Sequence, residues 1–178
     1  MERRQRSWPK FWLMTDERMG DSLWSAIERL PKGAGIVLRH YSIERSDRER
    51  LAAQVSRIAR TAGFLMAVAG DVELAERLGA DLVHNPAMGS RGLPFSRSVH
   101  SLAEARAAKA EGAALVFISP VYSTRSHPGL EPLGPELAQV IARAASVAAI
   151  ALGGMNDERF GSLPGGAFHG WAGIDAWL

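Results

Sequence analysis

Two adjacent glycines, Gly153-Gly154, follow an apolar run late in the chain and have the composition of a phosphate-binding turn. A backbone without Cβ atoms can bring its N–H groups onto phosphate oxygens. A plain tight turn is the alternative for the same residues. Ile174 and Asp175 follow the next apolar run and would lie beside the glycines if both runs are neighbouring strands. We therefore predict a phosphate-binding site formed by these four residues.

Two charged residues, Arg39 and Asp71, also come directly after apolar runs or end them. A guanidinium at a strand end suits a diphosphate or a carboxylate, and its alternative is a structural salt bridge with Asp16 or Asp71. The carboxylate of Asp71 could ligate a divalent cation such as Mg²⁺. Asp71 could equally be the N-cap of a helix that begins in Asp71-Val72-Glu73-Leu74.

Several hydroxyl and imidazole side chains complete the set of candidates. His84 and His100 could be acid–base or substrate-binding groups, or hydrogen-bonded scaffold residues. A polar tract over 123–129 could form a lid over a site, or be an ordinary surface loop. Further candidates to face a substrate are Ser98 and, within that tract, Thr124, Arg125 and His127. His169 precedes the last apolar run, and we assign it no function.

Eight short apolar runs, mostly separated by helical patterns, must position these residues. The runs are continuous rather than alternating, which is typical of strands buried on both faces. They cover 11–15, 35–39, 64–69, 81–84, 95–98, 114–119, 147–152 and 171–174. This order predicts an α/β fold, a (β/α)₈ TIM barrel, with its site at the carboxyl ends of the strands.

The connections between the runs predict shortened or missing helices after strands four, seven and eight. Capping boxes at Ser46-Asp47-Arg48-Glu49 and Ser101-Leu102-Ala103-Glu104 predict two of the helices that are present. The stretches 86–94 and 155–165 are too short or too rich in Gly and Pro for long helices, and only four residues follow strand eight. Apolar barrel surface that includes Trp177 and Leu178 would then be uncovered, so we predict a homodimer.

Composition bounds the class of protein. The 178 residues suit one domain, 1–178, whose residues 1–9 we expect to form a flexible extension. The net charge is +2 and the basic residues are scattered, which argues against nucleic acid as a partner. No cysteine is present, which excludes disulfides and Cys-ligated metals. No apolar run is long enough to span a membrane, and we expect a cytoplasmic protein.

The same positions resemble the thiamine-phosphate synthase family, which includes the thiazole tautomerases. The resemblance extends over about 13–176 and rests on several motifs in the family's order. They are Leu13-Met14-Thr15-Asp16, Val37-Leu38-Arg39, Gly79-Ala80-Asp81-Leu82-Val83-His84, Ser98-Val99-His100-Ser101, Ser119-Pro120-Val121-Tyr122-Ser123-Thr124, Ser126-His127-Pro128-Gly129 and Ala149-Ile150-Ala151-Leu152-Gly153-Gly154-Met155.

The resemblance implies a transferase of thiamine biosynthesis. It would join a hydroxymethylpyrimidine diphosphate to a thiazole phosphate and release diphosphate, with Mg²⁺ and cations stabilising the departing charge. By resemblance, Asp71 would hold Mg²⁺, and Arg39, Ser98 and Thr124 would face the diphosphate or the thiazole. Gly153 and Gly154 would bind the thiazole phosphate.

This chain differs from the family pattern mainly in the diphosphate half of the site. Val37 and Tyr41 replace the Gln and Lys that flank the second-strand Arg, and Gly70 replaces the Asn before the metal-binding Asp. Pro86-Ala87-Met88-Gly89 stands where the family has its second metal Asp, His127 replaces a Lys, and Asp175 replaces a Ser. Two alternatives therefore remain: a thiazole tautomerase-like enzyme, and a non-catalytic regulatory barrel that binds a phosphorylated thiamine precursor.

Overall fold

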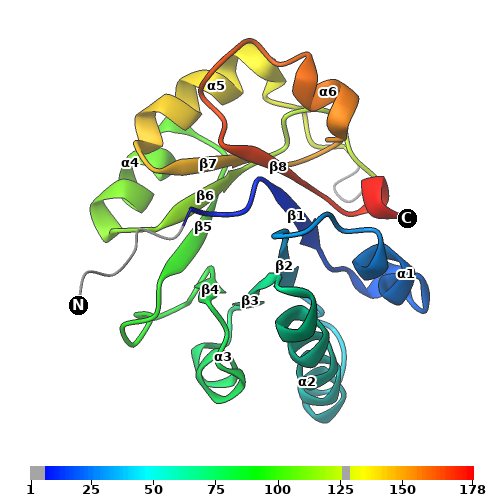
Figure 1. Cartoon of the computed structure of the whole chain (residues 1–178). Coiled ribbons are helices and arrows are strands. Elements are labelled where there is room, and N and C mark those ends of the chain that lie inside the picture. Colours follow the sequence, from blue (N-terminus) through cyan, green and yellow to red (C-terminus); the bar gives the residue numbers. More distant parts are fainter. Residues whose placement is uncertain (1–6, 126–128) are drawn as a thin grey trace.

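Eight parallel strands close into a barrel in which each strand pairs with its neighbours in the sequence and β1 pairs with β8. The computed structural model describes residues 7–125 and 129–178, and Figure 1 looks into this barrel. The strands are β1 Phe11–Met14, β2 Gly35–Leu38, β3 Leu65–Ala69, β4 Leu82–His84, β5 Phe95–Val99, β6 Leu115–Ile118, β7 Ala148–Ala151 and β8 Gly170–Gly173. All eight predicted strands are confirmed, with ends that differ by one residue or so.

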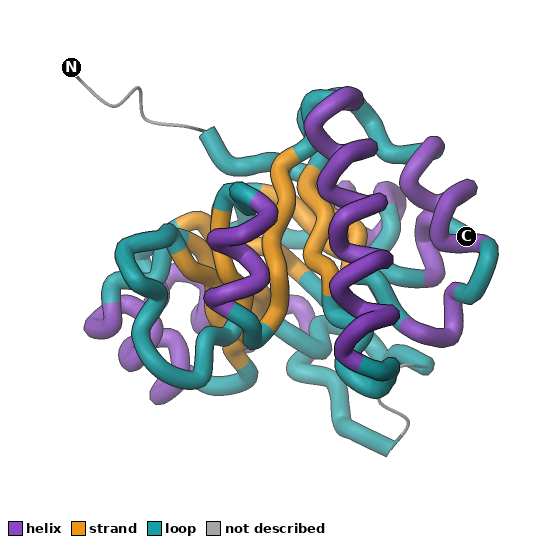
Figure 2. Tube along the Cα trace, turned by 90° about the horizontal axis from the view of Figure 1, so that it is seen from below, coloured by secondary structure: helices purple, strands orange, loops and turns teal. Residues whose placement is uncertain are grey.

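The helices lie outside the strands, and their lengths vary around the barrel (Figures 1 and 2). They are α1 Ser22–Glu28, α2 Arg45–Ala62, α3 Val72–Leu78, α4 Leu102–Glu111, α5 Gly134–Ala145 and α6 Asp157–Gly161, with 3-10 turns η1 Glu17–Met19 and η2 Asp175–Trp177. No helix separates β4 from β5, α6 has five residues, and only η2 follows β8. The three predicted gaps in the outer layer are therefore confirmed.

One of the two predicted capping boxes is correct. The Ser101 side chain accepts a hydrogen bond from the Glu104 amide at 3.2 Å and begins α4. The box at Ser46 is wrong, because α2 begins at Arg45 with Glu44 as an N-cap that makes no side-chain bond. Ser46 therefore lies inside the first turn of α2. The end of that helix is as expected: Gly63 adopts the left-handed conformation, with φ of 74°.

The barrel interior is filled by large side chains that fix the strand positions. Trp12 and Phe117 are fully buried, and their rings meet edge to face with centroids 5.5 Å apart. A Cβ added at Gly35 would lie 2.3 Å from the Trp12 ring, so glycine is required there for the indole to fit. This packing holds β1, β2 and β6 in register below the carboxyl ends of the strands.

Trp177 packs against β8 at the position that an eighth outer helix would occupy. Its ring stacks on Trp171 at 4.9 Å, and its Nε1 donates to the Trp12 carbonyl at 3.1 Å. Only 9% of Trp177 is exposed, so the prediction that it lies uncovered is wrong. Leu178 is half exposed, as predicted. The loss of the Trp177 surface removes part of the argument for a dimer.

The segment before β1 is packed against the barrel from Trp8 onward. His169 Nε2 donates to the Trp8 carbonyl at 2.6 Å, Pro9 is buried, and the Pro9 carbonyl accepts from Trp12 Nε1 at 2.8 Å. The predicted flexible extension over 1–9 is therefore wrong for residues 8 and 9, and residues 1–6 lie outside the described residues. Among the described helices none is both long and apolar enough to cross a membrane.

Candidate functional site

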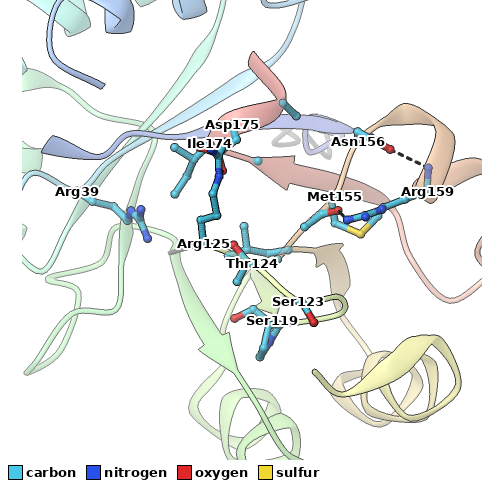
Figure 3. A pocket seen from close by; sticks show the side chains of 16 residues that line it. Arg39, Ser119, Ser123, Thr124, Arg125, Met155, Asn156, Arg159, Ile174 and Asp175 are labelled. Atoms are coloured by element: carbon cyan, nitrogen blue, oxygen red, sulfur yellow. Dashed lines mark hydrogen bonds and ion pairs between the residues drawn. The ribbon is translucent and has the colours of Figure 1, made fainter. Parts of the chain in front are cut away.

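A cavity of about 350 Å³ opens at the carboxyl ends of β6, β7 and β8 (Figure 3). It brings together seven of the residues predicted from the sequence: Arg39, Thr124, Arg125, Gly153, Gly154, Ile174 and Asp175. These residues come from four separate strand ends, as a barrel requires of its ligand site. Ser98, His84, His100 and Asp71 do not line it. His127 lies outside the described residues.

Gly153 and Gly154 form a turn that only glycine fits. Their φ angles are +94° and +62°. Residues with a Cβ adopt positive φ angles only at a cost in conformational energy. A Cβ at Gly153 would lie 2.7 Å from Pro120 Cα, and one at Gly154 would lie 2.6 Å from the Ser123 carbonyl oxygen. The turn therefore packs directly against the loop after β6. Neither glycine amide donates to another described residue, which leaves both N–H groups for a ligand.

Arg39 lines the cavity, and it also makes the structural salt bridge with Asp16 that was predicted as the alternative to ligand binding. Its Nε donates to the Thr15 carbonyl at 2.9 Å, and its Nη2 lies 3.1 Å from Asp16 Oδ2. Burial lowers the pKa of Arg39, and the neighbouring Asp16 carboxylate opposes that shift. The side chain is therefore held as a guanidinium in one orientation at the barrel mouth.

Asp175 and Arg125 form an ion pair across the cavity. Arg125 reaches from the loop after β6, and its Nε lies 3.2 Å from Asp175 Oδ2 (Figure 3). An unpaired carboxylate at this position would repel a phosphate, because both are negative. The pairing with Arg125 offsets that repulsion.

Asp71 belongs to a separate hollow over β3 and β4, which Arg48 and Tyr41 also line. Its Oδ1 accepts from the Leu74 amide at 2.9 Å, so Asp71 is the N-cap of α3, as the alternative predicted. Its Oδ2 lies 3.5 Å from Arg48 Nη1. Within 7–125 and 129–178 no three His, Asp or Glu side chains gather as metal ligands. Asp71 thus offers a single carboxylate here, and Mg²⁺ is commonly held by one or two carboxylates together with substrate phosphates.

Substitutions at Asp71 separate its capping role from its charge. Asp71→Asn should leave the free energy of unfolding within about 0.5 kcal/mol of wild type, because asparagine caps as well as aspartate. Asp71→Ala should cost about 1 kcal/mol, because the Leu74 amide loses its acceptor. Urea unfolding of both variants measures this. Equal losses in the two variants would mean that the charge facing Arg48, rather than the cap, stabilises the fold.

His84 and Ser98 lie in a buried hydrogen-bond network beneath the strand ends. His84 Nδ1 lies 2.9 Å from Ser96 Oγ, and its Nε2 lies 3.3 Å from Ser98 Oγ. The Ser98 hydroxyl also accepts from Asn85 Nδ2 at 2.9 Å. Burial lowers the pKa of His84 to about 3, so the ring is neutral. These contacts fit the scaffold alternative for His84, and they place Ser98 away from the cavity.

The burial of neutral His84 predicts acid sensitivity. Its pKa in the unfolded chain is about 6.5, so the unfolded state binds a proton that the native state does not as pH falls from 6.5 towards 3. This proton uptake does not affect the free energy of unfolding above pH 6.5. Below pH 6.5 it lowers the free energy of unfolding by up to about 1.4 kcal/mol per pH unit. Between pH 6.5 and 5, where few carboxylates titrate, His84→Gln should show a smaller decrease than wild type in urea unfolding. Parallel decreases would contradict a neutral His84.

His100 is exposed at the end of β5. Its Nδ1 donates to the Ser119 carbonyl at 2.8 Å, and its backbone amide donates to Glu104 Oε2 at 2.7 Å. It thus connects the end of β5 to Ser119, which lines the cavity at the end of β6.

Asn156, which precedes α6, and Arg159, which lies within it, line the cavity, although neither was predicted from the sequence. Asn156 is the N-cap of α6, and its side chain accepts from the Arg159 amide at 2.8 Å. Arg159 donates to the Gly154 carbonyl and lies over the Tyr122 ring at 5.1 Å. The available signal was Asn156 followed by the acidic residues Asp157 and Glu158, because an N-cap residue with acidic residues in the first turn indicates that a helix begins directly after the glycine turn.

Comparison with known proteins agrees with this arrangement. A family model described as thiamine monophosphate synthase matches residues 11–176. A candidate thiamine-phosphate synthase of Aquifex aeolicus, thiamine-phosphate synthase 2, is 27% identical over 182 residues, covering 96% of this chain and 98% of that protein. A thiamine-phosphate synthase of Geobacillus thermodenitrificans is 36% identical over 96 residues, covering 48% of this chain and 42% of that protein.

A solved structure shares the fold. The thiamine phosphate pyrophosphorylase of Pyrococcus furiosus superposes with a TM-score of 0.78 at 22% identity, covering 94% of this chain and 86% of that one. At this identity the likeness establishes the barrel alone. The family model, by contrast, covers the strands and loops that form the cavity, and the chain therefore belongs to the thiamine monophosphate synthase family.

Proposed function

We propose that the chain is a thiamine-phosphate synthase, which joins a hydroxymethylpyrimidine diphosphate to a thiazole phosphate and releases diphosphate. The observation that supports this most directly is the cavity itself. It combines the Gly153-Gly154 turn, whose two amides lack a partner among the described residues, with the guanidinium of Arg39. Its volume of about 350 Å³ lies at the lower end of the range for small-molecule sites.

The side chains present suit a reaction in which charge leaves on diphosphate. The bond between the pyrimidine methylene carbon and the diphosphate oxygen breaks, and its electron pair leaves with the diphosphate. The thiazole nitrogen then donates its electron pair to that carbon and forms the new C–N bond. The Arg39 guanidinium, already oriented by Thr15 and Asp16, would stabilise the departing charge. The glycine amides would hold the thiazole phosphate.

One assay tests this function. Purified protein is supplied with both phosphorylated precursors and Mg²⁺, and thiamine phosphate is measured by mass spectrometry. We expect product in proportion to enzyme, with heat-unfolded protein as the blank. Folded protein that yields no product above the blank would exclude the proposal.

Of the two alternatives, the structure gives least support to the tautomerase. An acid–base pair would have to face the substrate; of the three candidate histidines, His84 and His100 do not line the cavity, and His127 lies outside the described residues. The regulatory barrel stays the second candidate because the diphosphate half of the site, around Asp71, departs from the family pattern. There Arg48 faces the Asp71 carboxylate, which by resemblance would hold the metal. Binding of thiazole phosphate without product formation would favour it.

Three finer properties are part of this proposal. Dependence on Mg²⁺ is tested by loss of product in EDTA. A homodimer is tested by sedimentation equilibrium; Leu137 and Val140 of α5 and Leu178 are about half exposed and could lie in its interface. A cytoplasmic location is tested by cell fractionation.

A further inference from the structure

Three arginines line the cavity, and they differ in how their charge is used. Arg39 pairs with Asp16 at 3.1 Å, and Arg125 pairs with Asp175 at 3.2 Å. Arg159 makes no ion pair with any residue in 7–125 or 129–178. An anion that enters the cavity would have to compete with a carboxylate for either of the first two, whereas Arg159 offers its charge without that competition.

The neighbours of Arg159 hold its guanidinium at the glycine turn. Its Nη1 donates to the Gly154 carbonyl, and its Cζ lies over the Tyr122 ring, 5.1 Å from the ring centroid. A Cβ at Gly154 would come within 2.9 Å of that same nitrogen. The positive charge and the Gly154 backbone are therefore in direct contact, and both line the cavity.

The hydrogen-bonding capacity of Arg159 is largely unused. A guanidinium has five N–H donors in a fixed planar arrangement that matches phosphate oxygens. One nitrogen of Arg159 is engaged by the Gly154 carbonyl, and the side chain makes no other hydrogen bond within the described residues. Because the Tyr122 ring restricts its orientation, less conformational entropy is lost when it binds an anion.

We propose that Arg159 is the cation that recognises the phosphate group of the substrate bound at the Gly153-Gly154 turn, and that it determines the preference for a phosphorylated over an unphosphorylated thiazole. The inference rests on the proposed function for the identity of the ligand. A purely structural role is the competing explanation, in which Arg159 only holds the turn against the loop after β6.

Isothermal titration with two ligands separates the two roles. Thiazole phosphate and the same thiazole alcohol without phosphate are titrated into wild type and into Arg159→Gln, Arg159→Lys and Arg106→Gln. Arg106 is the matched control, since it is an exposed arginine of α4 that lines neither hollow. Thermal unfolding without ligand checks that every variant is folded.

We expect Arg159→Gln to weaken thiazole phosphate binding by about 10- to 100-fold, as for loss of a charged hydrogen bond. Binding of the alcohol should change less than about twofold, Arg159→Lys should be intermediate, and Arg106→Gln should match wild type. Equal weakening for both ligands, or none, would overturn the inference, as would wild type that binds the alcohol as tightly as the phosphate. A wild type that shows the expected preference but yields no thiamine phosphate would overturn the proposed function and leave the role of Arg159 intact.

Discussion

Gly153→Ala is expected to lower the free energy of unfolding by about 3 kcal/mol and to remove thiamine phosphate formation. At φ of +94° an alanine is strained by about 1–3 kcal/mol. Its Cβ would also lie 2.7 Å from Pro120 Cα and 3.2 Å from the Val121 amide nitrogen, so backbone must move. The two amides of the turn would move with it, away from any bound phosphate.

Urea unfolding and the synthase assay measure the two effects, with Gly161→Ala as the matched control. An added Cβ at Gly161, at the end of α6, meets no atom within 4 Å, and its φ is not positive. That variant should be as stable as wild type or slightly more, because alanine favours helix. A Gly153→Ala variant with wild-type stability and activity would mean that the loop after β6 adapts easily and that the turn geometry is dispensable.

Arg39→Gln is expected to reduce kcat by about 100- to 1000-fold, the usual effect of removing one preorganised donor from a developing negative charge. Its effect on stability should be smaller, about 1–2 kcal/mol, because Asp16 keeps its ion pair with Arg18 at 2.7 Å. We expect this contrast because the Arg39 side chain both bonds to Thr15 and Asp16 and lines the cavity. Steady-state kinetics and urea unfolding of the same preparation measure it.

A double substitution separates the ion pair between Arg39 and Asp16 from the proposed role of Arg39 in catalysis. In the background of Asp16→Asn, the scaffold ion pair is already absent, so Arg39→Gln should cost less stability than in wild type. The loss of kcat should persist. If the double variant recovered activity together with stability, Arg39 would act only by positioning the barrel mouth.

The strand order was predictable because strands that are buried on both faces have mostly apolar residues in sequence. Most strands of this barrel are continuous apolar runs, as at Leu115–Ile118, whereas β5 carries Ser96, Arg97 and Ser98 in its middle. Once the strands are placed, the barrel topology puts Arg39, Gly153 and Asp175 at one face. The gathering of predicted residues in one cavity follows from topology rather than from knowledge of any contact.

What the sequence left undecided depends on side-chain direction and on pairing across the barrel. Asp71 has the spacing of both a metal ligand and a helix cap; the 2.9 Å bond to Leu74 shows the cap, and the role as a metal ligand stays a prediction. Trp177 was expected to be exposed because no sequence pattern indicates that a short turn folds its indole back onto Trp171. Arg159 was missed because a five-residue helix gives no periodic signal.

The pairing of β1 with β8 closes the barrel, and Trp177 adds a hydrogen bond to Trp12, 165 residues away in the chain. Such a contact forms only after the loop-closure entropy of nearly the whole chain has been overcome, so closure is expected late in folding. Until then β1 and β8 are open edges with unpaired N–H and C=O groups, which can pair with strands of other molecules. The cavity does not exist in that species, because its walls come from β2 and from β6 to β8. A phosphorylated ligand that binds only the closed barrel would therefore also protect the folding chain against aggregation.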